Sequence, residues 1–266
     1  MGHKLSKAVP KFKFVNKIRV IARLDIKNEF VIKGIHLEGL RKVGDPNDLA
    51  KKYYENGIDE IVFIDAVAAY YDRNSLSNII RAACKHVFIP ITVGGGIRKI
   101  DDIKTALING ADKVAINTKA VQNPDFITKD SKIFGSQCIV SSIEAKKIDE
   151  NKWEVYIDNG REPTGLNVLE WAKEVEKLGA GELLLTSIDK DGTKKGPDLD
   201  LNQAVSDSIS IPIISSGGIG NSGDAIKMLK NSNIDAIAIA SVLHYELEDI
   251  KDIKHALLEN NIRVRL

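Results

Sequence analysis

Polar side chains at the ends of predicted strands are the residues of this chain best placed to do chemistry. Asp25 and Glu144 form the most informative pair, because a shift of 119 positions lays Asp25-Ile26-Lys27 over Glu144-Ala145-Lys146. Two carboxyl groups that face one substrate can serve as acid and base if their surroundings separate their pKa values. The alternative for each is an ordinary role as a helix cap or a loop anchor. The polar residues at or just past predicted strand ends are Asp25, Asp65, Asn117, Glu144, Asp189, Asp191 and Ser216.

Two glycine-rich turns repeat each other at a fixed distance along the chain. Gly94-Gly95-Gly96 and Ser216-Gly217-Gly218 each follow an Ile-Pro-Ile run, and Gly95 and Gly217 lie 122 positions apart. The same shift superposes Asp102 on Asp224. Backbone N–H groups in such a turn, together with the N-terminus of the helix that follows, favour a bound anion. The repeat therefore indicates two equivalent half-chains and a substrate that carries a phosphate at each end.

Short β-branched runs alternate with amphipathic segments along the whole chain, and these elements must hold the polar residues in place. Eight strands separated by helices, in two halves of four, predict a parallel (β/α)8 TIM barrel built from two half-barrel repeats. An open, doubly wound sheet is the structural alternative. The predicted strands are Ile18–Asp25, Glu60–Val67, Val87–Val93, Lys113–Asn117, Gln137–Ile143, Glu182–Ile188, Ile211–Ser215 and Ala236–Ala240. The predicted helices are Asp45–Asn56, Ser75–Lys85, Asp101–Asn109, Leu166–Leu178 and Asp224–Asn231.

Two local patterns add detail to this outline. Asp45 before Pro46 is typical of an N-cap followed by proline at the first helical position. The alternation Trp153-Glu154-Val155-Tyr156 predicts a hairpin over Lys146–Glu162, inserted after the fifth barrel strand.

Composition limits the class of protein. The 266 residues, 43% hydrophobic and 28% charged, suit a globular α/β domain over residues 18–266 that needs no disulfide to stabilise its core. A formal net charge of +1 gives no reason to expect nucleic acid or a membrane surface as a partner. Met1–Lys17 is expected to be a basic, mobile arm. Cys84 and Cys138 lack metal-ligand spacing, so we expect no metal and a reducing, cytoplasmic setting.

Four charged residues begin predicted strands at the opposite end of the barrel. Arg19, Glu60, Lys113 and Glu182 stand at the starts of the first, second, fourth and sixth strands. They could be exposed strand ends. They could also pair into a ring that closes the bore, because buried charges need partners.

These features resemble those of a known protein family. From about Lys17 to Leu266 the chain resembles the cyclase subunit of imidazole glycerol phosphate synthase, a barrel enzyme of histidine biosynthesis. The most specific matching stretches are Val31-Ile32-Lys33-Gly34, Gly44-Asp45-Pro46, Thr92-Val93-Gly94-Gly95-Gly96-Ile97, Gly110-Ala111-Asp112-Lys113-Val114, Phe134-Gly135-Ser136-Gln137, Leu185-Thr186-Ser187-Ile188-Asp189 and Asp191-Gly192-Thr193.

The resemblance implies a bisphosphorylated substrate, phosphoribulosyl-formimino-aminoimidazole-carboxamide ribotide, and no cofactor. It also implies a glutaminase partner at the base of the barrel, near Asp112, whose ammonia enters through the charged ring and crosses the bore. Asp25 matches the general acid–base group of the family, and Glu144 stands where a second catalytic aspartate is usual. The positions that would orient substrate or bind phosphate are Lys33, Asp65, Gly95, Gly96, Asn117, Thr118, Thr186, Asp191, Ser216, Gly217, Gly218, Ala240 and Ser241.

The catalytic end departs from the family pattern, whereas the charged ring matches it. Glu144 carries one methylene more than aspartate, and a displacement of about 1 Å can cost on the order of 100-fold in rate. Arg23 replaces a usual cysteine; strand alternation points it into the bore, where it would pair with Asp25 or Glu144 and depress the pKa of that carboxyl. Ala68-Ala69-Tyr70 and Pro197 are further differences.

These departures leave alternatives to the histidine-pathway activity. The chain also resembles a second, paralogous copy found among surface-saccharide genes, which with a glutaminase-like partner would supply ammonia to an enzyme that amidinates an acetamido sugar. A further alternative is another bisphosphate-binding barrel, such as a related sugar-phosphate isomerase.

Overall fold

A closed parallel barrel forms the centre of the molecule. The computed structural model describes residues 17–68 and 76–266, so the predicted arm lies outside the described residues except for Lys17. Eight parallel strands follow the order β10-β11-β12-β1-β4-β5-β6-β7 within the described chain, and β10 closes the barrel onto β7. The barrel prediction is therefore confirmed, and the open sheet is excluded. The strands are β1 (Arg19–Lys27), β4 (Glu60–Asp65), β5 (Ile91–Gly94), β6 (Lys113–Ile116), β7 (Ile139–Asp149), β10 (Glu182–Ser187), β11 (Ile213–Ser216) and β12 (Ala236–Ile239).

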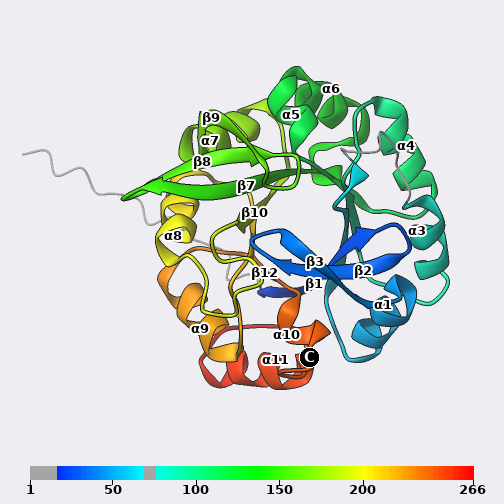
Figure 1. Cartoon of the computed structure of the whole chain (residues 1–266), viewed down its shortest axis with the longest axis vertical. Helices are drawn as coiled ribbons and strands as arrows, with labels where there is room; N and C mark the ends of the chain where they lie inside the picture. Colours follow the sequence, from blue (N-terminus) through cyan, green and yellow to red (C-terminus); the bar gives the residue numbers. More distant parts are fainter. Residues whose placement is uncertain (1–16, 69–75) are drawn as a thin grey trace, which may run out of the picture.

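Helices surround the barrel, as the view along its axis shows (Figure 1). Asp45 caps the first of them, because its Oδ1 accepts hydrogen bonds from the N–H groups of Asn47 and Asp48 at 2.8 and 3.0 Å. The predicted helix over Leu166–Leu178 starts two residues later, since Leu166 and Asn167 belong to a strand. The helices are α1 (Pro46–Glu55), α3 (Ser77–Ala83), α4 (Ile100–Ile108), α5 (Thr118–Gln122), α6 (Asp125–Phe134), the 3₁₀ helix η1 (Ser136–Cys138), α7 (Val168–Leu178), α8 (Leu199–Ser208), α9 (Ser222–Asn231), α10 (Ser241–His244) and α11 (Ile250–Glu259).

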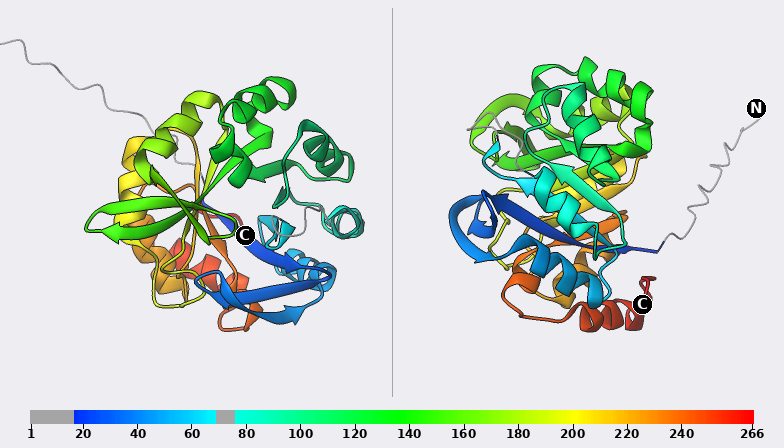
Figure 2. Two further views of the ribbon diagram at one scale, coloured as in Figure 1. Left: turned by 45° about the horizontal axis from the view of Figure 1, so that its top comes forward. Right: turned by 90° about the vertical axis from the view of Figure 1, so that its right-hand side faces the viewer.

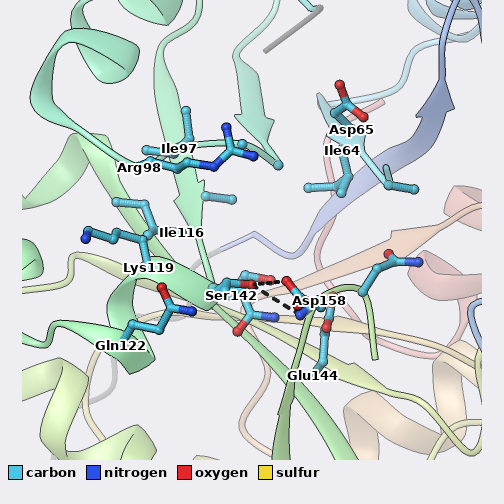
Figure 3. Close-up of a pocket in the computed structure, with 17 residues that line it drawn as sticks. Ile64, Asp65, Ile97, Arg98, Ile116, Lys119, Gln122, Ser142, Glu144 and Asp158 are labelled. Atoms are coloured by element: carbon cyan, nitrogen blue, oxygen red, sulfur yellow. Dashed lines mark hydrogen bonds between the residues drawn. The ribbon is translucent and has the colours of Figure 1, made fainter. Parts of the chain in front are cut away.

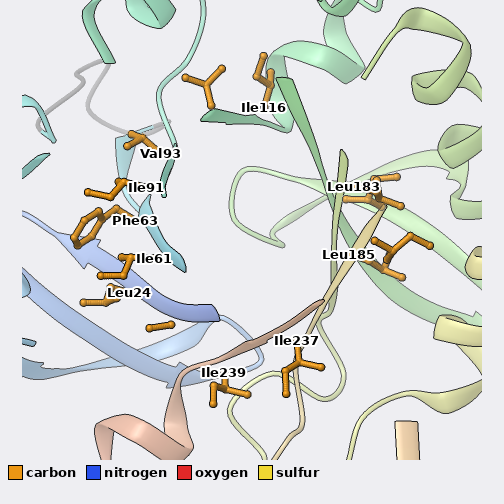
Figure 4. Packing of buried hydrophobic residues seen from close by; sticks show 14 of the residues in the cluster. Leu24, Ile61, Phe63, Ile91, Val93, Ile116, Leu183, Leu185, Ile237 and Ile239 are labelled. Carbon is orange, nitrogen blue, oxygen red and sulfur yellow. The ribbon is translucent and has the colours of Figure 1, made fainter. Parts of the chain in front are cut away.

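Strand alternation divides the apolar side chains between two cores. Outward-facing residues such as Leu24, Phe63 and Leu185 pack against the helices (Figure 4). Complete burial of one such side chain contributes about 1.5–3 kcal/mol to stability. Inward-facing residues form a second, separate cluster inside the bore, which we call the apolar belt: Ile21, Val62, Ala115, Val140, Leu184, Ile214, Ala236 and Ala238.

Antiparallel extensions project beyond one end of the barrel, opposite the C terminus (Figure 2). β7 continues past the barrel to Asp149 and pairs with β8 (Lys152–Ile157), as the hairpin pattern predicts. The structure adds a third strand, β9 (Glu162–Asn167), and a second hairpin, β2 (Phe30–Ile35) and β3 (Glu38–Gly44), that the sequence analysis missed. Because β1 and β7 run on into these extensions, Asp25 and Glu144 lie inside strands rather than just past their ends.

The half-chain repeat appears in the backbone of the two glycine turns. Gly95 and Gly217 have φ values of 86° and 107°, in the region that favours glycine. A Cβ atom on Gly95 would lie 2.3 Å from the carbonyl oxygen of Asp65, and one on Gly217 would lie 2.8 Å from that of Ser187. Each turn thus packs onto the end of the neighbouring strand, β4 or β10, too closely for a side chain.

Asp130, on α6, is a buried carboxylate whose two oxygens have no hydrogen-bond partner within the part of the chain that the structure describes. Burial raises the pKa of Asp130 to about 6, although Lys129 opposes the shift. Because this folded-state pKa exceeds the ordinary value of 3.8, the carboxyl makes the protein less stable as pH rises between these values, and the loss persists at higher pH.

We expect Asp130→Ala to increase the free energy of unfolding at pH 8 by about 1–3 kcal/mol, since an unpaired buried polar group costs about this much. The gain should be smaller at pH 5, where the folded protein keeps the carboxyl protonated. Chemical denaturation at both pH values measures the effect, with Lys132→Ala as an exposed control on the same helix. An equal gain at both pH values would contradict the assignment.

Candidate functional site

A buried network of charges occupies the C-terminal end of the barrel, which we call the mouth. Arg23 points into the bore as predicted, and its Nε donates to Oδ1 of Asp25 at 2.9 Å. Its Nη1 donates to the hydroxyls of Thr186 and Ser216, at 2.8 and 3.2 Å. The guanidinium therefore spans the bore from β1 to β10 and β11, and Asp25 rather than Glu144 is its carboxylate partner.

Asp25 is held as a carboxylate by two cations. Burial by itself would raise the pKa of Asp25, but the charges of Arg23 and Lys33 outweigh burial and hold the pKa below its ordinary value. Nζ of Lys33 lies 3.5 Å from Asp25 and donates to both carboxylate oxygens of Asp191 at 2.8 Å. Lys33 thus links two of the predicted site carboxylates.

Glu144 is in the opposite electrostatic state. Burial raises the pKa of Glu144 to about 7, against the lowering effects of Arg23 and of the Gly160 N–H, which donates to its Oε2 at 2.7 Å. Two carboxyl groups in one mouth therefore have pKa values shifted in opposite directions. This separation is what an acid–base pair requires.

The first glycine turn borders a cavity of about 310 Å³ (Figure 3). The structure brings six of the predicted site residues together around it: Asp65, Gly95, Gly96, Asn117, Thr118 and Glu144. The sequence analysis missed Arg98, Lys119, Gln122, Ser142, Asp158 and Asn159, which also line it. Asp158 and Asn159 come from the turn between β8 and β9, and Thr118 lies within 3.4 Å of Asp158 Oδ1. The hairpin thereby supplies one wall of the cavity.

The second glycine turn borders a much smaller cavity, of about 20 Å³. Its lining contains seven predicted residues: Lys33, Asp191, Ser216, Gly217, Gly218, Ala240 and Ser241. Thr186 lines neither cavity; its hydroxyl accepts a hydrogen bond from Arg23 instead. Asp189 is a loop anchor instead, since its Oδ2 accepts a hydrogen bond from the Lys147 N–H at 2.7 Å.

The four charged residues at the base form a closed ring of ion pairs. Arg19 contacts Glu60 at 2.8 Å and Glu182 at 2.5 Å. Lys113 contacts the same two carboxylates, at 3.1 and 2.8 Å. Each charge thus has two partners of opposite sign, and the ring, rather than a set of free strand ends, covers the base of the bore.

Asp112 lies beside this ring at the start of β6. Its Oδ2 accepts a hydrogen bond from the Ile91 N–H at 2.8 Å, while the residue as a whole remains exposed. Of the other departures from the family pattern, Pro197 is buried, and Ala69-Tyr70 lies outside the described residues.

Across residues 17–68 and 76–266, no cluster of three His, Cys, Asp or Glu side chains could hold a metal ion. No helix in these ranges is long and apolar enough to cross a membrane.

Fold and site together define a (β/α)8 barrel with two equivalent glycine turns around a mouth that contains two carboxyl groups. The chain belongs to the histidine biosynthesis protein family, whose profile matches residues 19–248. It is 57% identical over 206 residues to the imidazole glycerol phosphate synthase subunit HisF of Legionella pneumophila, covering 77% of this chain and 97% of that protein.

Two longer alignments agree with this assignment. The subunit HisF of Bacillus cereus (strain G9842) is 46% identical over 248 residues, which is 93% of this chain and 98% of the relative. The subunit HisF of Lactococcus lactis subsp. lactis (strain IL1403) is 47% identical over 249 residues, which is 93% of this chain and 96% of the relative.

Proposed function

We propose that the chain is the cyclase subunit of an imidazole glycerol phosphate synthase. With ammonia from a glutaminase partner, it converts phosphoribulosyl-formimino-aminoimidazole-carboxamide ribotide into imidazole glycerol phosphate and aminoimidazole carboxamide ribotide. The observation that carries this proposal is the pairing of Asp25 and Glu144, with oppositely shifted pKa values, between two glycine turns. The turns would hold the two phosphates, and the carboxyl groups would act on the atoms between them.

The two carboxyl groups have different roles in the reaction: one transfers protons and the other stabilises charge. Glu144, with a pKa of about 7, can accept and return protons near neutral pH, as ring closure and cleavage of the ribulosyl chain require. Asp25 stays ionised beside Arg23 and stabilises positive charge that develops on nitrogen. Asp25, at the family's first acid–base position, would therefore act in this chain as a permanently ionised carboxylate.

The base of the barrel is the side that we assign to the glutaminase. Asp112 is exposed there beside the ring of ion pairs. Phe88, just before β5, and Ile108, at the end of α4, are 75% and 84% exposed on the same side. Aromatic and aliphatic side chains that are exposed around a polar centre are typical of protein interfaces.

The direct test is turnover of the bisphosphate substrate by the purified chain, with excess ammonium chloride at alkaline pH, followed by absorbance. External ammonia replaces the partner, so this assay tests the mouth alone. Product formation would support the cyclase proposal. Its absence, in folded protein that still binds the bisphosphate, would overturn it.

The ammonia-supplying paralogue is the second candidate, and Arg23 is the observation that favours it. A guanidinium bonded to Asp25 restrains one of the two carboxyl groups without affecting the ring at the base. Under this alternative, the complex with a glutaminase would release ammonia to a sugar-modifying enzyme, and the bisphosphate would not be turned over. The ammonium assay separates the two candidates.

Arg19→Ala is expected to uncouple glutamine hydrolysis from cyclisation in the complex with the partner. Without Arg19, Glu60 and Glu182 keep only the Lys113 side of the ring, so the base no longer controls passage of ammonia. We expect less product per glutamine hydrolysed, while turnover with external ammonium persists. Lys104→Ala, an exposed change on α4, is the control. Unchanged coupling in Arg19→Ala would contradict a gating role for the ring.

A further inference from the structure

The tip of the β2–β3 hairpin combines a strained backbone with residues that such a backbone rarely carries. Ile35 pairs with Glu38, so His36 and Leu37 alone join the two strands. Both residues have positive φ values, of 55° and 62°. Two-residue turns of this geometry usually contain asparagine and glycine, because most other residues are strained in the left-handed region. Strain of this kind persists where surrounding contacts hold it, and it points to a role for the side chains of the tip.

The tip lies against the mouth rather than in solvent. The backbone N–H of His36 donates to the carbonyl oxygen of Asp191 at 2.9 Å, and its Nδ1 donates to that of Ile188, also at 2.9 Å. Leu37 is only 4% exposed. A cavity of only about 10 Å³ lies between Asp25 and Leu37, so the tip packs closely over the mouth.

Leu37 contacts the turn between β8 and β9, Asp158–Gly160, which we call the wall turn because two of its residues line the cavity at the first glycine turn. A Cβ atom on Gly160 would lie 2.8 Å from Cδ1 of Leu37, so the leucine side chain occupies the space beside this glycine. The side-chain amide of Asn159 donates to the carbonyl oxygen of Leu37 at 3.5 Å. The hairpin tip and the wall turn therefore touch through both side chain and backbone.

The wall turn carries a hydrogen-bond donor to Glu144. The Gly160 N–H donates to Oε2 of Glu144 at 2.7 Å, and Gly160 has a φ value of 76°, in the region that favours glycine. The first residue of the turn is held from α5, because the Thr118 hydroxyl accepts a hydrogen bond from the Asp158 N–H at 3.2 Å. Leu37 holds the last residue. A chain of contacts thus runs from the hairpin tip through Gly160 to the carboxyl group.

We propose that Leu37 and Gly160 are positioning residues for Glu144: the hairpin tip fixes the wall turn, and the wall turn fixes the orientation of the carboxyl group. Neither residue transfers a proton itself. The consequence for turnover rests on the proposed function, in which Glu144 accepts the proton, whereas the chain of contacts does not. A displacement of about 1 Å can cost on the order of 100-fold in rate, so contacts remote from the reacting atoms can control turnover.

The amide proton of Gly160 reports on the last contact of this chain. In amide NMR spectra its chemical shift should change with a midpoint near pH 7, because the hydrogen bond strengthens when Glu144 ionises. Glu144→Gln should remove the change, which assigns it to Glu144. The variants of the tip described next leave the charged groups around Glu144 unaltered: Arg23 and Asp25 on β1, Asp65 at the end of β4, Arg98 and Lys119 across the cavity, and Asp158 on the wall turn.

Leu37→Gly removes the contact and gives the tip a residue that its backbone accepts without strain, so the hairpin still forms. We expect the pH-dependent shift of the Gly160 amide to fall below about half of its original size. With external ammonium, kcat should fall by about 10- to 100-fold while KM for the bisphosphate changes little. Leu37→Met conserves the volume of the side chain and should keep both properties. Ile35→Ala, an exposed change on the same hairpin, is the control.

Three outcomes would overturn the inference. One is an unchanged titration of the Gly160 amide in Leu37→Gly. Another is an equal loss in Ile35→Ala, since any disturbance of the hairpin would then have the same effect. The third is a reduced titration with unchanged kcat, because Glu144 would then need no positioning. Absence of ammonium-driven turnover in the unsubstituted chain would instead overturn the proposed function, and the amide titration would still decide whether the tip holds Glu144.

Discussion

Asp25→Asn is expected to lower ammonium-driven turnover by about 10²–10⁴-fold, the range that a positioned acid–base or charged group contributes. The reason is electrostatic. Asp25 is the carboxylate partner of the buried Arg23 guanidinium and lies 3.5 Å from Lys33. Asparagine has nearly the same shape but no charge, so the buried Arg23 guanidinium would lose its carboxylate partner, while Lys33 would keep Asp191.

Binding separates a chemical role from a structural one. Neither glycine turn contacts the changed atoms, so the affinity for the bisphosphate, measured by calorimetry, should change little. Asp207→Asn, an exposed change on α8, is the matched control. Full turnover in Asp25→Asn would remove Asp25 from the mechanism, and loss of bisphosphate binding would assign it to substrate binding instead.

Glu144 is expected to set the pH dependence of turnover near neutrality. A group whose pKa is raised to about 7 is protonated below this pH and ionised above it. As a base that accepts a proton from the attacking nitrogen, it must be ionised, so kcat/KM for the bisphosphate should rise with pH through about 7. The measurement is made at a constant concentration of free ammonia, because ammonia itself titrates.

Glu144→Gln should abolish this titration and lower turnover by about 10²–10⁴-fold, since the amide cannot accept the proton. Glu162→Gln, on the exposed part of β9, should leave both the rate and the profile unchanged. A profile that keeps its inflection near pH 7 in Glu144→Gln would show that another group carries it.

The sequence was sufficient to predict the barrel because the repeat consists of patterns of residues that are close together in the chain. The shift that superposes Gly95 on Gly217 also superposes Asp102 on Asp224, and each aspartate accepts a hydrogen bond from a backbone N–H just past its own turn. The inward direction of Arg23 followed from strand alternation alone. These features depend on residues close together in the chain.

The missing parts of the site depend on contacts between distant segments. Asp158 and Asn159 reach the cavity at the first glycine turn only because β7 and β8 fold back over the mouth. Lys33 pairs with Asp191 because the β2–β3 hairpin, which no local pattern predicted, brings it across. The choice of Asp25 over Glu144 as the partner of Arg23 is likewise set by three-dimensional geometry. No spacing in the sequence encodes such encounters directly.

The unequal cavities beside the two glycine turns have a consequence for the orientation in which a ligand binds. Two identical half-barrels would offer a twofold axis, and a ligand with a phosphate at each end could then settle either way round with equal populations. Here the first turn borders a cavity of about 310 Å³, whereas the second borders one of about 20 Å³ that adjoins a further cavity of about 710 Å³ beside the β2–β3 hairpin. The duplicated scaffold has therefore lost its symmetry around the two turns, so a ligand with a phosphate at each end would bind in one orientation in preference to the other.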